Sequence, residues 1–222
     1  MGKLIKNFTE LKLNNQTFFP SGLSALDYLF LKALAIKFNV RTYLEIGSFI
    51  GESMDDVIDV VDRGISISLL DLELEEYFKL REMKNLASYF SNNKKITQYK
   101  EDSRKFDYSK LPKDIDLVFI DGDRSYEGVL SDTKNISMCV DMTNTIMVWH
   151  DFRYGKEMFR YSVIDGVFDA LDTKYHDNIF YVDNNSSGIY IPDKYLYKFD
   201  FSNNDDIFYS YESTIKIKTN RV

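Results

Sequence analysis

Residues 116–121 read Asp-Leu-Val-Phe-Ile-Asp, an unbroken apolar run with an aspartate at each end. A run this short and this apolar is typical of a strand in a parallel sheet that is covered on both faces. Its last residue, Asp121, would then lie at the carboxyl edge of the sheet, where ligands bind in open α/β folds. These six residues predict a buried strand with an acidic group at its functional end.

Strands and helices are expected to alternate on both sides of this run. Further strands are predicted for TYLEIG (42–47), SISLLD (66–71), KITQYK (95–100) and TIMVWHD (145–151). Helices are predicted over 22–39 (with Ser21 as N-cap), 52–62, 74–90 and 126–140. Residues 178–193 predict an antiparallel pair that turns at Asn184–Gly188. This order is typical of a Rossmann-like, doubly wound, mostly parallel sheet with helices on both faces and a C-terminal antiparallel hairpin.

Length and charge narrow the class of protein. The 222 residues suit a single domain over 1–222, with a helical lead-in over 1–40, a core over 41–193 and a tail over 194–222 of unassigned role. The lone Cys139 excludes an internal disulfide framework. The net charge of −7 argues against a nucleic-acid partner. With no signal peptide and no membrane span in view, a cytoplasmic location is expected.

The first strand leads into a glycine turn, Glu45-Ile-Gly47-Ser48-Phe49-Ile50-Gly51. Glycines suit a sharp turn at which a ligand approaches the backbone. Bulky Phe49 and acidic Glu52 disfavour a phosphate against the following helix. The turn therefore favours a ligand with an amino-acid head and no phosphate. A tight loop that binds no ligand could have the same sequence.

Two further acidic positions follow predicted strands. Asp71 comes 24 residues after Gly47, close to the spacing at which an acid binds a ribose in nucleotide-binding units. Asp102 and Ser103 follow the third strand, where they could accept from an adenine amino group. Each position has a structural alternative, because Asp71 could cap a helix and Asp102 could cap a turn.

Other reaction classes remain open at this point. Asp121-Gly122-Asp123 is a D-x-D string that could hold a metal on a nucleotide-sugar diphosphate, as in a metal-dependent glycosyltransferase. His150 could act as a general base. Arg124 is expected either in solvent or on an anionic group of a substrate. A non-catalytic binding module of the same fold is the third alternative.

Four strings resemble the class I S-adenosylmethionine (SAM)-dependent methyltransferases, and within them the group of macrocin-type sugar O-methyltransferases and cephalosporin-biosynthesis methyltransferase-like proteins. The strings are Tyr43-Leu-Glu-Ile-Gly-Ser-Phe-Ile-Gly-Glu-Ser53, Glu101-Asp-Ser103, Leu117-Val-Phe-Ile-Asp-Gly-Asp-Arg-Ser-Tyr-Glu-Gly128 and Val148-Trp-His-Asp-Phe152. The resemblance covers roughly residues 40–152. It implies a SAM-dependent methyltransferase that methylates a hydroxyl on a sugar, glycan or secondary metabolite.

The resemblance also implies roles for individual residues. The cofactor-binding set it implies is Glu45, Gly47, Ser48, Gly51, Ser53, Asp71, Asp102, Ser103 and Asp121. Asp121, His150 and Asp151 are the expected catalytic residues and also the candidate metal ligands.

This sequence departs from the pattern of the family at two positions, because many relatives have histidine in place of Arg124 and an acid in place of His150. A nitrogen ligand makes Mn²⁺ or Fe²⁺ conceivable beside Mg²⁺, and a metal-free site stays open. The expected partners are a small-molecule or glycan acceptor and a second copy in a homo-oligomer.

Overall fold

The computed structural model describes residues 8, 10–14, 23–49, 51–68, 93–154, 158–182 and 185–199. The predicted helix over 74–90, Asp71, and the tail beyond 199 lie outside these residues. Within the described part, seven strands form one sheet. In spatial order they are β3 (Ile96–Tyr99), β2 (Arg63–Ile67), β1 (Thr42–Ile46), β4 (Leu117–Ile120), β5 (Ile146–Trp149), β9 (Gly188–Tyr190) and β8 (Ile179–Tyr181).

The direction of the strands confirms the predicted fold class. The first five strands of this order are parallel, whereas β9 is antiparallel to β5 and β8 is antiparallel to β9. From β1 the chain proceeds to β2 and β3 on one side, and from β4 it proceeds to β5 on the other. The switch point between β1 and β4 is where a doubly wound sheet offers a ligand crevice.

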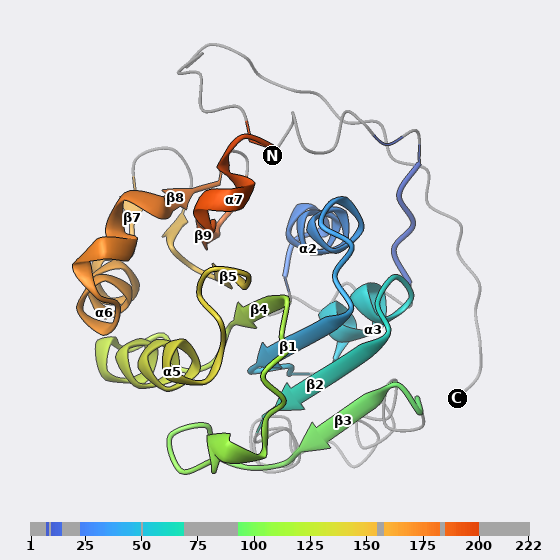
Figure 1. Cartoon of the computed structure of the whole chain (residues 1–222), viewed down its shortest axis with the longest axis horizontal. Helices are drawn as coiled ribbons and strands as arrows, with labels where there is room; N and C mark the ends of the chain where they lie inside the picture. Colours follow the sequence, from blue (N-terminus) through green and yellow to red (C-terminus); the bar gives the residue numbers. More distant parts are fainter. Residues whose placement is uncertain are drawn as a thin grey trace.

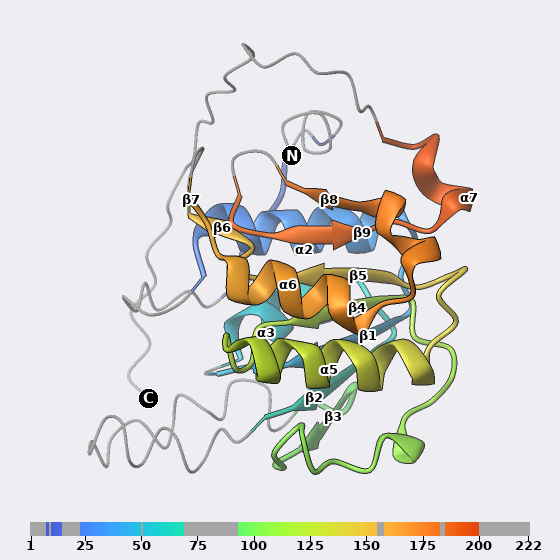
Figure 2. The same ribbon diagram turned by 90° about the vertical axis from the view of Figure 1, so that its left-hand side faces the viewer.

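Helices cover both faces of the sheet (Figure 1). On one face lie α2 (Ala25–Lys37) and α3 (Glu52–Ile58), and on the other lie α5 (Tyr126–Cys139) and α6 (Tyr161–Ala170). Successive residues of β4 point to opposite faces of the sheet. Phe119 packs in the hydrophobic core that includes α2 and α3, whereas Val118 packs in the core that includes α5 and α6. Figure 2 shows α5 and α6 lying side by side against the sheet. Burial on both faces explains why β4 is apolar throughout.

Backbone hydrogen bonds continue beyond the strand ends and align the residues that follow. The Gly47 N–H donates to the Ile67 carbonyl at 3.0 Å, and the Asp121 N–H donates to the Ile46 carbonyl at 2.9 Å. The His150 N–H donates to the Ile120 carbonyl at 3.0 Å. Gly47, Asp121 and His150 consequently lie along one edge of the sheet.

The predicted start of the first helix was wrong. α2 begins at Ala25 with Ser24 as its N-cap, not at residue 22 after Ser21. The Ser24 N–H donates to Asp27 Oδ2 at 2.8 Å, and the Asp27 N–H donates to Ser24 Oγ at 3.3 Å. This reciprocal capping box satisfies two backbone donors, which places the helix start at Ser24.

Several other boundaries also differ from the prediction. α3 ends at Ile58 rather than at 62, because buried Val61 already belongs to the turn into β2, and β2 begins at Arg63 rather than at 66. Residues 152–165, for which the sequence analysis gave no helix or strand, contain the small hairpin of β6 (Arg153–Tyr154) and β7 (Met158–Phe159) and the start of α6. The sequence also did not predict the short helix α7 (Asp193–Leu196) or the 3-10 turns η2 (Tyr108–Lys110) and η3 (Thr173–Asn178). No helix in the described ranges has the length and apolar character needed to cross a membrane.

Candidate active site

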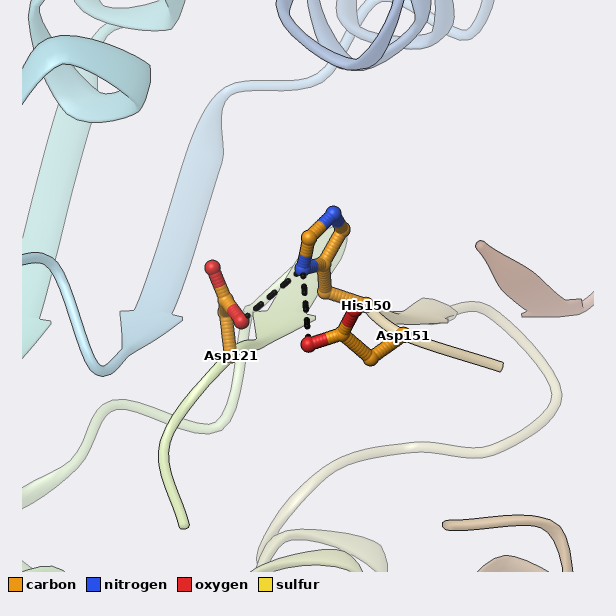
Figure 3. A group of neighbouring side chains, drawn as sticks. All are labelled: Asp121, His150 and Asp151. Atoms are coloured by element: carbon orange, nitrogen blue, oxygen red, sulfur yellow. Dashed lines mark hydrogen bonds and ion pairs between the residues drawn. The ribbon is translucent and has the colours of Figure 1, made fainter. Parts of the chain in front are cut away.

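Asp121, His150 and Asp151 meet at the carboxyl ends of β4 and β5 (Figure 3). His150 Nδ1 lies 3.1 Å from Asp121 Oδ1 and 3.5 Å from Asp151 Oδ2. The ligand atoms of all three side chains fall within 4.8 Å of one another. The structure therefore brings together the three residues that the sequence predicts as catalytic.

Asp151 has a strained backbone. Its φ is +56°, in the left-handed region that non-glycine residues rarely enter, and it is buried. Strain of this kind costs about 1–3 kcal/mol and tends to occur at functional sites. Because His150 continues the β5 ladder, the left-handed turn at Asp151 lets both neighbouring side chains face Asp121.

Asp27 is a fourth member of the cluster that the sequence analysis missed. It is 2% exposed on α2, and its Oδ2 lies 3.7 Å from His150 Nε2. Ser24 Oγ also donates to this oxygen at 2.6 Å. The available signal was the Ser24-x-x-Asp27 capping pattern, together with the single acid on a mostly apolar helix. The imidazole of His150 thus has a carboxylate at each nitrogen.

These carboxylates decide the charge of His150. Burial by itself lowers its pKa, but Asp121, Asp151 and Asp27 outweigh burial and raise the pKa to about 12. Burial raises the pKa of Asp27 and of Asp151, whereas their contacts with His150 bring the net pKa of both below the usual value. At neutral pH His150 is therefore an imidazolium that donates from its ring nitrogens, and it holds no free lone pair for a proton.

Arg124 contacts the cluster, although about half of its side chain is exposed to solvent. Its Nε is 2.5 Å from Asp151 Oδ2, and its Nη2 is 3.8 Å from Asp121 Oδ1. The arginine side chain is 48% exposed, whereas the Asp151 side chain is 6% exposed. Arg124 and His150 thus contact the same two carboxylates from different sides.

The glycine turn lies directly against Asp121. Gly47 has φ +86°, and a Cβ built there would lie 2.2 Å from the Asp121 carbonyl oxygen. Gly51 also has φ +86°, and Phe49 has φ +45°. Glycine is needed at 47 for the left-handed backbone and for the close approach to β4. The turn and the acidic cluster therefore form one continuous site.

Glu45 and Ser53 hydrogen-bond to each other in the interior beneath this turn. Glu45 is fully buried, and its carboxylate accepts from Ser53 Oγ at 2.6 Å and from Tyr43 Oη at 2.7 Å. Desolvation raises the pKa of Glu45 to about 7 in spite of these two donors. Ser48 is also buried, and its Oγ lies 2.7 Å from Ser66 Oγ.

Glu45→Gln is expected to flatten the pH dependence of stability. A carboxyl whose folded pKa lies above its unfolded value stabilises the protein most at low pH, and this contribution is lost as the pH rises. For Glu45 the window runs from 4.5 to about 7. Across it, one such group lowers the unfolding free energy by up to about 1.4 kcal/mol per pH unit. Urea unfolding at several pH values should show a smaller slope in the variant.

Glu101→Gln is the control, because Glu101 forms a half-exposed ion pair with Lys110 at 3.3 Å. This variant should keep the wild-type slope. Burial also raises the pKa of Asp56 to about 7 and that of Asp132 to about 6. These two groups therefore keep part of the pH dependence of stability in every variant. Equal slopes for Glu45→Gln and wild type would show that Glu45 ionises normally inside the fold.

Asp102 and Ser103 lie in the segment that follows β3. Arg104 donates to both carboxylate oxygens of Asp102, at 3.0 and 3.1 Å, and these hydrogen bonds lower the pKa of Asp102. Arg104 also reaches Asp123 Oδ2 at 4.0 Å. Arg104 thus links Asp102, the residue predicted to lie near the adenine, to Asp123 in the loop after β4.

The D-x-D string does not act as a unit. Asp123 Oδ1 accepts from the Ser125 N–H at 2.9 Å, and the Asp123 side chain is half exposed. Within the described residues, the group spaced for a metal joins Asp121 to His150 and Asp151 and leaves out Asp123. A small hollow of about 10 Å³ opens beside this group, and its lining includes Asp121, Asp123, Arg124 and His150. The arrangement therefore favours one site around Asp121.

Sequence and structure comparisons are consistent with this geometry. Residues 44–152 match a family described as a methyltransferase domain. The match begins within β1 and ends just after Asp151, so it contains the glycine turn and the cluster of Asp121, His150 and Asp151. No curated protein matches the chain.

Three solved structures share the fold. A methyltransferase from Podospora anserina with bound S-adenosylhomocysteine (SAH) has 13% identity and a TM-score of 0.58, covering 86% of this chain and 92% of its own. A provisionally assigned O-methyltransferase from Klebsiella pneumoniae has 14% identity and a TM-score of 0.54, covering 86% and 95%. The O-methyltransferase TomG from Streptomyces achromogenes, in complex with SAM, has 12% identity and a TM-score of 0.52, covering 86% and 96%. At these identities the likeness establishes the fold.

Proposed function

We propose, from the match of residues 44–152 to a methyltransferase domain, that this chain is a SAM-dependent methyltransferase that acts on a hydroxyl group. The observation that carries the proposal is the contact between the glycine turn and the acidic cluster. Gly47 packs on the backbone of Asp121, so a ligand over the turn would lie beside the cluster. Methyl transfer needs this proximity, because donor and acceptor must align for an in-line displacement.

The cofactor would lie along the carboxyl edge from β1 towards β3. Its methionine part would lie against the Glu45–Gly51 turn, and its adenine near Asp102 and Ser103. The ligands of the Podospora and Streptomyces structures, SAH and SAM, support this choice. Asp71 is the proposed ribose ligand by its sequence position alone.

Asp121 is the proposed proton acceptor. As the acceptor oxygen bonds to the methyl group, its O–H proton must leave to a nearby base. His150 is protonated at neutral pH, and Asp151 is held by Arg124 at 2.5 Å. Asp121 lines the hollow beside the cluster and belongs to the loop that the glycine turn contacts. His150 would position this carboxylate, with its Nδ1 3.1 Å from Asp121 Oδ1.

The proposed acceptor is a hydroxyl on a sugar, a glycan or a secondary metabolite. A carboxylate base without a free imidazole suits a hydroxyl, whose proton becomes acidic only as the new bond forms. The O-methyltransferase neighbours of the same fold agree with this choice.

A product assay tests this function. Purified protein, SAM and a panel of sugars, nucleotide sugars and phenols should yield SAH together with one methylated acceptor, detected by mass spectrometry. An N-methylated amine as the only product would contradict the hydroxyl assignment. SAM turnover that no member of a broad panel stimulates would contradict the proposed reaction.

A further inference from the structure

Arg124 and His150 already contact two carboxylate oxygens of the cluster, one on Asp121 and one on Asp151. Arg124 Nε lies 2.5 Å from Asp151 Oδ2, and Arg124 Nη2 lies 3.8 Å from Asp121 Oδ1. From another side, His150 Nδ1 lies 3.1 Å from the same Asp121 oxygen and 3.5 Å from the same Asp151 oxygen. Each of these two oxygens therefore faces two protein nitrogens.

The spacing of the cluster would suit a divalent ion, but its charge does not. Two carboxylates and one imidazole with ligand atoms within 4.8 Å form a donor set that Mn²⁺ or Fe²⁺ accepts, provided that the ion displaces the imidazole proton. An ion on Asp151 Oδ2 would share that oxygen with the guanidinium 2.5 Å away. Arginine cannot lose its proton in a protein, so the two cations would repel each other strongly. The residues present do not fit a divalent metal while Arg124 keeps this position.

The Arg124–Asp151 contact also differs from an ordinary surface ion pair. Exposed pairs contribute little, because water screens both charges. Here the Asp151 side chain is 6% exposed, and its backbone is held at φ +56°. A buried carboxylate is costly without compensating charge, so Arg124 stabilises Asp151 alongside His150.

We propose that the Arg124 guanidinium takes the place of a divalent cation, so that methyl transfer at this site is metal-independent. This inference rests on the proposed function. Arg124 neutralises Asp151 through their close charge contact, which leaves Asp121 as the carboxylate that can take the acceptor proton. Arg124 is a positioning residue in this scheme, because it acts through the two aspartates.

Manganese binding tests the proposal without an acceptor. The free Mn²⁺ signal in electron paramagnetic resonance is measured with wild type, Arg124→Gln, Arg124→Lys and Arg63→Gln. Arg63 forms a surface ion pair with Asp114 at 2.9 Å. Arg63→Gln therefore removes one positive charge, as Arg124→Gln does, but at a position outside the site. Arg124→Gln should bind Mn²⁺ at least about tenfold more tightly than wild type, whereas Arg124→Lys and Arg63→Gln should resemble wild type.

Three outcomes would overturn the proposal. Tight Mn²⁺ binding by wild type that Asp121→Asn abolishes would show that the metal displaces Arg124. No gain in Arg124→Gln, with circular dichroism showing a folded protein, would show that Arg124 is not what excludes the ion. Tight binding by Arg124→Lys would show that charge is not the reason. SAM titrations of the same samples, with and without a chelator, separate these results from the proposed function. An absence of SAM binding would contradict the proposed function but not the proposal that Arg124 excludes the metal.

Discussion

Gly47→Ala is expected to abolish SAM binding and to lower the unfolding free energy by about 3 kcal/mol or more. The left-handed backbone at φ +86° costs a residue with a Cβ about 1–2 kcal/mol. The new methyl group would also lie 2.2 Å from the Asp121 carbonyl oxygen and 2.5 Å from the Asp121 carbonyl carbon. These are backbone atoms at the end of β4, so relief requires β1 and β4 to move apart at the switch point. Urea unfolding and calorimetric titration with SAM measure the two effects.

Gly122→Ala is the matched control from the same contact region. A Cβ at 122 would meet Asp132 Oδ2 at 3.2 Å and Ile46 Cγ2 at 3.5 Å, which small movements can relieve. Its cost should stay within about 1 kcal/mol. If Gly47→Ala and Gly122→Ala had equal effects, the close contact between the turn and Asp121 would not determine the site.

Asp121→Asn is expected to lower turnover by about 10²–10⁴-fold while changing the affinity for SAM far less. The amide keeps the shape of the side chain but cannot take the acceptor proton. It also removes the negative charge that His150 Nδ1 contacts at 3.1 Å. The measurement is the rate of SAH formation with the best acceptor found in the product assay.

Asp123→Asn is the control for this variant, because it makes the same chemical change on the same loop. The Asp123 side chain is half exposed and accepts from the Ser125 N–H at the start of α5. Turnover should remain close to wild type. Equal losses in Asp121→Asn and Asp123→Asn would favour the D-x-D interpretation over a single base at Asp121.

The sheet and its functional edge could be predicted because buried parallel strands have a simple pattern. The run from Leu117 to Ile120 is apolar because both of its faces are covered, and the aspartate after it marks the edge. The sharp turn after β1 could also be predicted from its glycines, since Gly47 and Gly51 both take left-handed conformations. Position relative to a strand end was therefore sufficient to place Asp121, His150 and Asp151 at the functional edge, whereas their expected roles came from the family resemblance.

The partners of these residues could not be predicted, because they depend on how distant elements pack. Asp27 meets His150 because the first turn of α2 packs near the residue that follows β5. The sequence analysis placed Asp27 in a helix but put the start of that helix at the wrong residue. Arg124 reaches Asp151 through a side-chain conformation that no sequence pattern specifies. The helix α6 was missed because Gly166 weakens its pattern, although Gly166 also allows close packing against Val129 of α5.

Calorimetric titration of the purified protein with SAM tests the central claim most directly, with NAD and a UDP-sugar titrated in parallel. Our account predicts micromolar binding of SAM, unchanged by a chelator, and no heat with the other two ligands. An absence of heat with SAM, together with metal-dependent binding of the UDP-sugar that Asp121→Asn abolishes, would contradict the account and favour a glycosyltransferase.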